Sequence, residues 1–207
     1  MKHFLLFLFL FPVLVFAQPN SQNFSQPSFR LGAQVGYGYR IGEISRYMIS
    51  TYQNEKQLRN NVSFGTDFSY YFNKNIGFGI KYNGVVNSTS IFDNYYEKFL
   101  RKVNINYLGA FFGVRFLMNQ NRNCLFANSG VGYVNFRDNI HIINGNSYAF
   151  LSEIGFDFFV TKYFALGLQV SLSIGALENI YIENKKISGI RENLTHVDIS
   201  LGFRFYK

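Results

Sequence analysis

Apolar and polar residues alternate one by one over long stretches of the chain. The clearest stretch runs from Tyr163 to Gly175. Its even-numbered residues are all large and apolar, whereas its odd-numbered residues after Tyr163 are Ala, Gly, Gln or Ser. Because successive side chains of an extended strand point to opposite faces, the pattern predicts a β-strand with one apolar face and one face of small residues.

The same alternation recurs in eight segments, and no helical period competes with it. The segments are about 29–41, 62–72, 76–86, 103–116, 124–136, 147–160, 163–175 and 195–206. Short turns join the second segment to the third, the fourth to the fifth and the sixth to the seventh. Long polar loops, at about 42–61, 87–102, 137–146 and 176–194, join the others. Short turns at one end and long loops at the other are typical of outer-membrane barrels.

Two folds are compatible with these strands, and they differ in what the apolar faces contact. A soluble sandwich or lipocalin-like barrel turns its apolar faces inward, whereas a membrane barrel turns them toward lipid. The opposite faces here carry many glycines, among them Gly32, Gly36, Gly109 and Gly167. Glycine weakens a strand exposed to water but suits the crowded interior of an eight-stranded barrel. The sequence therefore predicts an all-β fold, an eight-stranded antiparallel up-and-down transmembrane β-barrel over 29–207.

The beginning of the chain predicts export. Lys2 and His3 precede an apolar run from Phe4 to Phe16, and a plausible cleavage site ends at Ala17. The run is shorter than the roughly 20 residues of a spanning helix. We therefore expect a signal peptide at 1–17, a periplasmic polar linker at 18–28, and the barrel in the outer membrane. An even number of strands places both barrel termini in the periplasm.

Charge narrows the range of partners. The net charge is +8, and an exported chain is not expected to bind nucleic acid. The charge suits outer-membrane lipids, including anionic lipopolysaccharide, although a genomic bias toward Lys and Asn explains it equally well. Basic residues in the predicted loops are candidate lipopolysaccharide contacts, with ordinary hydrated loops as the alternative. These residues are Lys98, Arg101, Lys102, Lys185, Lys186 and Arg191.

Ionisable residues on the glycine-rich faces are predicted to line the lumen. They are Arg30, Arg40, Asp67, Lys81, Arg115, Glu153, Asp157, Asp198 and Arg204. Charges inside a membrane span are costly unless they are paired or hydrated. The two signs mix at middle height, whereas a selective pore shows rings of one sign. A plug of ion pairs is therefore favoured over a narrow ion path.

His196, Asp198 and Ser200 offer the side chains of a catalytic triad. Residues two apart on a strand are separated by about 6.6–6.8 Å, whereas triad contacts are about 2.6–3.2 Å. We therefore expect no catalytic site. The sequence contains no metal-ligand cluster and no phosphate-binding loop, so no metal or cofactor is expected. Cys124 is the only cysteine, which excludes an intramolecular disulfide.

Several short motifs resemble a known family. They are Gly36-Tyr-Gly38, Ile105-Asn-Tyr-Leu108, Gly130-Val-Gly-Tyr133 and Gly202-Phe-Arg-Phe205. Over 29–207 the chain resembles the small outer-membrane β-barrel domain family that includes PorT-like proteins, although Gly109-Ala-Phe111 departs from the family's Glu-Ile-Pro. The ending Phe205-Tyr206 resembles the aromatic signal read by the barrel-assembly machinery. The resemblance implies a role in secretion, with an unidentified secretion-system partner, and no catalytic residues.

These patterns favour a non-enzymatic outer-membrane barrel with a lumen filled by side chains. Its role would lie in envelope structure or in surface interaction through long extracellular loops. Three alternatives stay open: an accessory component of protein secretion or envelope assembly, a lipid A-modifying enzyme, and a narrow pore.

Overall fold

The computed structural model describes residues 28–45, 55–92, 98–118, 122–139, 143–177, 180–182, 185–187 and 191–207. The predicted signal peptide lies outside these residues, and so does the predicted linker apart from Ser28. Within the described residues, no helix is long and apolar enough to cross a membrane.

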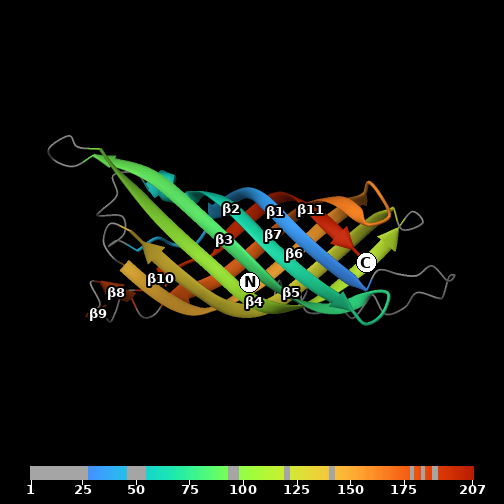
Figure 1. Cartoon of the computed structure of the whole chain (residues 1–207). Coiled ribbons are helices and arrows are strands. Elements are labelled where there is room, and N and C mark those ends of the chain that lie inside the picture. The colour runs from blue at the N-terminus through green and yellow to red at the C-terminus, as the bar shows by residue number, and fades with distance from the viewer. Residues whose placement is uncertain are drawn as a thin grey trace.

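Eight long strands form a closed barrel (Figure 1). They are β1 (Phe29–Arg40), β2 (Asn60–Tyr71), β3 (Ile76–Phe92), β4 (Lys98–Met118), β5 (Asn123–Asp138), β6 (Ile143–Phe159), β7 (Phe164–Leu177) and β11 (His196–Tyr206). Each strand is antiparallel to both neighbours, and the pairing of β11 with β1 closes the ring. The predicted up-and-down barrel is confirmed.

The strands are strongly staggered around the ring. Following paired residues from Arg30 through β2 to β7 and then β11 leads back to Arg40, at the opposite end of β1. A stagger of this kind requires the strands to tilt, as Figure 1 shows. An eight-stranded barrel is only wide enough for side chains to fill. The inward-facing side chains of the eight strands are therefore expected to fill the lumen.

The outer surface of the barrel is apolar across the middle of its strands. On β7, the side chains of Leu166 and Leu168 are 48% and 51% exposed, whereas Ala165 and Gln169 are buried. Further exposed apolar residues include Leu31, Val35, Phe68, Ile80, Val131, Ile154, Ile199 and Leu201. A continuous apolar belt of this kind suits hydrocarbon rather than water. The predicted outward orientation of the apolar faces is thus confirmed.

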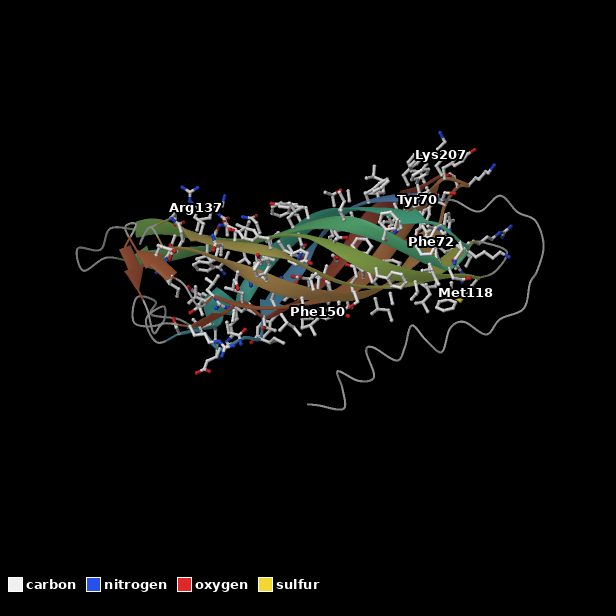
Figure 2. The ribbon with its side chains drawn as sticks, turned by 90° about the horizontal axis from the view of Figure 1, so that it is seen from below. Tyr70, Phe72, Met118, Arg137, Phe150 and Lys207 are labelled. Atoms are coloured by element: carbon white, nitrogen blue, oxygen red, sulfur yellow. The ribbon has the colours of Figure 1, made fainter. Side chains whose placement is uncertain are left out.

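Aromatic rings lie at the turn end of this belt. Tyr70 contacts both Phe29 and Phe78, with ring centroids 5.3 and 5.8 Å apart. Figure 2 shows Tyr70 and Phe72 at this end of the barrel and Arg137 at the other. Such a girdle is expected at a membrane interface.

The loop end has more secondary structure than the sequence predicts. The predicted loop 87–102 consists largely of the extended β3–β4 hairpin, paired from Asn87 and Val103 to Phe92 and Lys98. The first long connection contains the short helix α3 (Glu55–Arg59), although no helix was expected. The last contains β8 (Ile180–Ile182), β9 (Lys185–Ile187) and β10 (Glu192–Asn193). These loop predictions were wrong because polar residues hide the alternation of strands that stand above a membrane.

Candidate functional site

Buried charges of opposite sign occupy the interior. Besides His196, the buried charged side chains among the described residues are six cations and six carboxylates. They are Arg30, Arg40, Lys81, Arg101, Arg115 and Arg204, with Asp67, Asp138, Glu153, Asp157, Glu192 and Asp198. All of the lumen residues predicted from the sequence belong to this set. The set is formally neutral, so other residues carry the net charge of +8.

Arg30 is the centre of a cluster near the turn end. Its Nη1 lies 2.8 Å from Asp67 Oδ2, and its Nε lies 3.3 Å from Asp157 Oδ2. The guanidinium carbon also lies 4.0 Å from the centre of the Phe126 ring. The hydroxyl of Tyr206 donates a hydrogen bond to Asp157. One cation thus joins side chains from β1, β2, β5 and β6, and Tyr206 adds β11.

Glycines leave space for these carboxylates. A Cβ atom built at Gly32 would lie 2.5 Å from Asp67 Oδ1, and one at Gly167 would overlap Asp157 Oδ1. Any side chain at either position would displace a carboxylate that faces Arg30. The charge cluster therefore requires glycine at these two positions, which agrees with the predicted crowded interior.

Arg115 lies at the turn end, beside the cluster. Its guanidinium carbon stacks 3.6 Å from the centre of the Tyr71 ring. Its Nε donates a hydrogen bond to the carbonyl of Lys74 at 3.0 Å. Arg115 therefore ties the first short turn to the barrel interior.

A second cluster occupies the middle of the lumen. Lys81 and Glu153 form an ion pair, and both side chains are fully buried. Glu153 also accepts hydrogen bonds from Asn128 Nδ2 at 2.6 Å and from Gln169 Nε2 at 3.3 Å. A buried ion pair is tolerated when further hydrogen bonds satisfy it in this way. Arg204 links the two clusters, because its Nε lies 3.9 Å from Asp157 Oδ1 and its Nη2 donates a hydrogen bond to Gln169.

The triad-like residues lie higher in the lumen. His196 Nε2 is 3.3 Å from Asp198 Oδ2, so the expectation that these side chains stay apart was wrong. They lean toward each other along β11. Ser200 Oγ has no hydrogen-bond partner among the described residues, so nothing activates it. All three side chains are at most 3% exposed. A substrate has no access to them, and they do not form a catalytic triad.

Two further ion pairs were not predicted. Arg40 pairs with Glu192, which lies in the predicted last loop. Arg101 was predicted to be a surface contact, but it is 1% exposed and its Nε lies 3.0 and 2.9 Å from the two carboxylate oxygens of Asp138. The placement of Arg101 was wrong because β4 extends beyond its predicted boundary and turns this residue inward. The alternation of the predicted segment 103–116 continues back to Arg101, and this continuation is the signal that was missed.

The other candidate surface contacts are placed only in part. Lys102 and Arg191 are exposed. The backbone of Lys98 lies in β4, and those of Lys185 and Lys186 lie in β9. The side chains of these three lysines lie outside the described part of the structure.

An apolar cluster, here called the apolar cap, fills the lumen toward the loop end. It consists of Ile44, Leu58, Val85, Val103, Ile105, Tyr107, Val134, Phe136, Ala149, Leu151, Leu177, Ile180 and Leu194. Its strand residues continue the inward faces that carry charges below, as Val85 does above Lys81 on β3. Ile44, Leu58 and Leu194 come from the connections and α3. The sequence did not predict this cap, because only the small and polar faces were assigned to the interior.

The described residues contain no group of three or more side chains suited to hold a metal ion. The contacts that fill the interior join protein side chains to one another.

Solved structures share this architecture. The crystal structure of Neisserial surface protein A is similar with a TM-score of 0.60 at 13% identity, covering 89% of this chain and 100% of that chain. This chain has the fold of a transmembrane β-barrel. Less similar are the N-terminal barrel domain of Pseudomonas aeruginosa OprF (TM-score 0.47, 10% identity, 88% and 100% covered) and the attachment invasion locus protein Ail of Yersinia pestis (0.46, 14%, 86% and 98%). No family model and no curated protein matches the sequence, so the PorT-like resemblance of this barrel stays a prediction.

Proposed function

We propose that this barrel is a non-conducting, non-enzymatic protein of the outer membrane that acts through its loop end and outer wall. The filled interior is the observation that supports this most directly. Ions cross a membrane protein through a water-filled pore or past polar groups that replace their hydration shell. Here paired charges occupy the membrane-level lumen, and the apolar cap lies above them. Neither layer offers an ion a free coordinating ring.

The ends of the barrel strands support an outer-membrane orientation. The backbone N–H of Phe29 donates to the carbonyl of Lys207 at 2.7 Å, so the barrel begins and ends at the turn end. Short turns face the periplasm in barrels of this class. The predicted export signal is consistent with this orientation.

Planar-bilayer recording of the purified protein tests the closed lumen. We expect no steady conductance from the wild type. The variant Lys81→Ala/Glu153→Ala removes both side chains of the middle pair without leaving a lone charge, and we expect it to open more often. A reproducible open channel in the wild type would overturn the proposal.

Lipid A chemistry tests the non-enzymatic part separately. The polar groups that resemble a catalytic set are buried beneath the apolar cap. We expect lipid A to have the same mass profile in cells with and without the gene. A mass shift that depends on the gene would identify a lipid A-modifying enzyme instead.

A further inference from the structure

A row of large side chains marks the upper edge of the apolar belt on one wall. Tyr82, Leu108, Tyr133 and Tyr148 are register partners across β3, β4, β5 and β6. Tyr133 and Tyr148 are 45% and 83% exposed, so their rings face outward. Tyrosine is enriched where hydrocarbon meets water because its ring is apolar and its hydroxyl is polar. Because the strands are tilted, this row rises toward the loop end from β3 to β6. On β4, β5 and β6 it marks the change from apolar to polar outward side chains, which we take as the membrane boundary of each strand.

The next two outward rows toward the loops are rich in asparagine. We call them together the asparagine strip, which consists of Asn106, Asn135 and Asn146 in the first row and Asn104, Arg137 and Asn144 in the second. The Tyr82 hydroxyl donates to Asn106 Oδ1 at 2.8 Å, which joins the strip to the tyrosine row. Lys102 is exposed next to the second row on β4. The strip is thus a continuation of the lipid-facing wall.

Charge at the loop end is also sorted between inside and outside. The carboxylates of Asp138 and Glu192 are turned inward, where Arg101 and Arg40 neutralise them. The exposed charged side chains described at this end are one acidic and four basic, namely Glu43, Lys56, Lys102, Arg137 and Arg191. The described part of this surface therefore favours an anionic partner.

We propose that the asparagine strip, with Lys102, binds the phosphorylated sugar headgroup of lipopolysaccharide in the surrounding leaflet. This rests on the proposed outer-membrane location. The strip directly continues the lipid-facing wall, so its neighbour is a molecule of the same leaflet. Asparagine amides both donate and accept hydrogen bonds, as sugar hydroxyls require. Arg137 and Lys102 supply the cations for phosphate.

The described residues of the opposite wall, formed by β1, β2, β7 and β11, show no equivalent strip. β1, β2, β7 and β11 have 12, 12, 14 and 11 residues, whereas β3, β4, β5 and β6 have 17, 21, 16 and 17. Among the described strands, only β4, β5 and β6 carry two polar outward positions above this row, and on β3 the same two rows hold Gly84 and Val86. The barrel would therefore hold lipopolysaccharide on one side, in a fixed orientation.

Binding of fluorescent lipopolysaccharide to the purified full chain in neutral detergent tests this site. We expect Lys102→Gln/Arg137→Gln to weaken binding by roughly tenfold or more, because each basic residue near an anionic surface contributes substantially. The matched control is Lys56→Gln/Arg191→Gln, which removes the same charge at the same end but off the strip, and its affinity should stay within about twofold of wild type. Equal losses in both variants, or none in the first, would overturn the proposal.

Two more measurements separate binding to the sugar hydroxyls from attraction to the phosphate charge. Asn135→Ala/Asn146→Ala should weaken binding of intact and of dephosphorylated lipopolysaccharide alike, since its targets are hydroxyls. Phosphatidylglycerol should compete poorly, and competition equal to that of lipopolysaccharide would overturn the site in favour of a general anionic surface. Circular dichroism checks that each variant is folded. Conductance of the same preparations tests the closed lumen independently, so the two proposals can fail separately.

Discussion

The membrane-level barrel carries its apolar side chains on the outer face, whereas the strands at its loop end carry them on the inner face. On β7, Leu168 faces out and Gln169 faces in. On β4, Ile105 faces in and Asn106 faces out. Strand alternation separates two faces, and the medium outside decides which of them must be apolar. A single strand can show both patterns: on β4 the outward Leu108 is 60% exposed at membrane level, whereas the apolar Ile105 above it faces inward.

The two regions are consequently held together by different forces. At the loop end, packing the apolar cap removes apolar surface from water, which is directly favourable. At membrane level the outside is already apolar, so the interior contributes through packing and through its ion pairs and hydrogen bonds. Some buried atoms of this network, such as Arg30 Nη2 and Asp67 Oδ1, have no hydrogen-bond partner among the described residues. The membrane-level lumen should therefore be most sensitive to the loss of a charge partner, and the cap to the loss of volume.

The largest effect is expected for Lys81→Met. It leaves Glu153 charged and buried without its cation, which we expect to lower the free energy of unfolding by about 3–5 kcal/mol. Urea titration in lipid vesicles measures this. The double variant Lys81→Met/Glu153→Leu buries no charge and should recover most of the loss. A single variant within about 1 kcal/mol of wild type would show that the pair is not a buried one.

A smaller loss of stability is expected when an outward-facing residue is replaced by arginine, and its size should differ between the hydrocarbon belt and the region above the tyrosine row. Leu168→Arg places a cation in the hydrocarbon belt near the middle of β7 and should lower the free energy of unfolding by about 2–4 kcal/mol. Asn146→Arg puts the same side chain outward but above the tyrosine row, where the cost should be about 0–1 kcal/mol. Equal costs at the two positions would mean that the tyrosine row does not mark the membrane boundary.

The residues of the membrane-level interior could be predicted from the sequence because one rule applies there: the apolar face of each strand points to lipid and the opposite face points into the lumen. Charges such as Arg30 and Asp157 share their strand faces with glycine, and this was enough to place them inside. Which charges meet was not accessible, since Arg30 and Asp157 are 127 residues apart and meet only through the register of the closed barrel. Pairing across a ring depends on its stagger, which no single strand reveals.

The extended strands at the loop end were not predicted, because above the membrane the apolar face of a strand points inward. Lys102 and the residues before it look like a loop when an apolar outer face is required, so the predicted fourth strand begins at 103 whereas β4 begins at Lys98. Arg101 was therefore assigned to the surface. An alternation with its apolar residues on the inward face is the signal of a strand that has left the bilayer. Val103 and Ile105, at the start of the predicted segment, already show this reversal, which indicates that the strand continues upward beyond them.

The smallest predicted effect compares the apolar cap with the lipid-facing wall. Ile105 is 3% exposed inside the cap, whereas Ile199 is 55% exposed on the outer face. Ile105→Val removes one methylene and leaves a gap that fixed neighbours cannot fill, so it should lower the free energy of unfolding by about 1–1.5 kcal/mol. Ile199→Val loses at most the transfer free energy of that group, about 0.8 kcal/mol, because acyl chains fill the space. Urea titration of both variants in the same vesicles measures the difference. A larger loss at Ile199 than at Ile105 would mean that the cap is not a packed core.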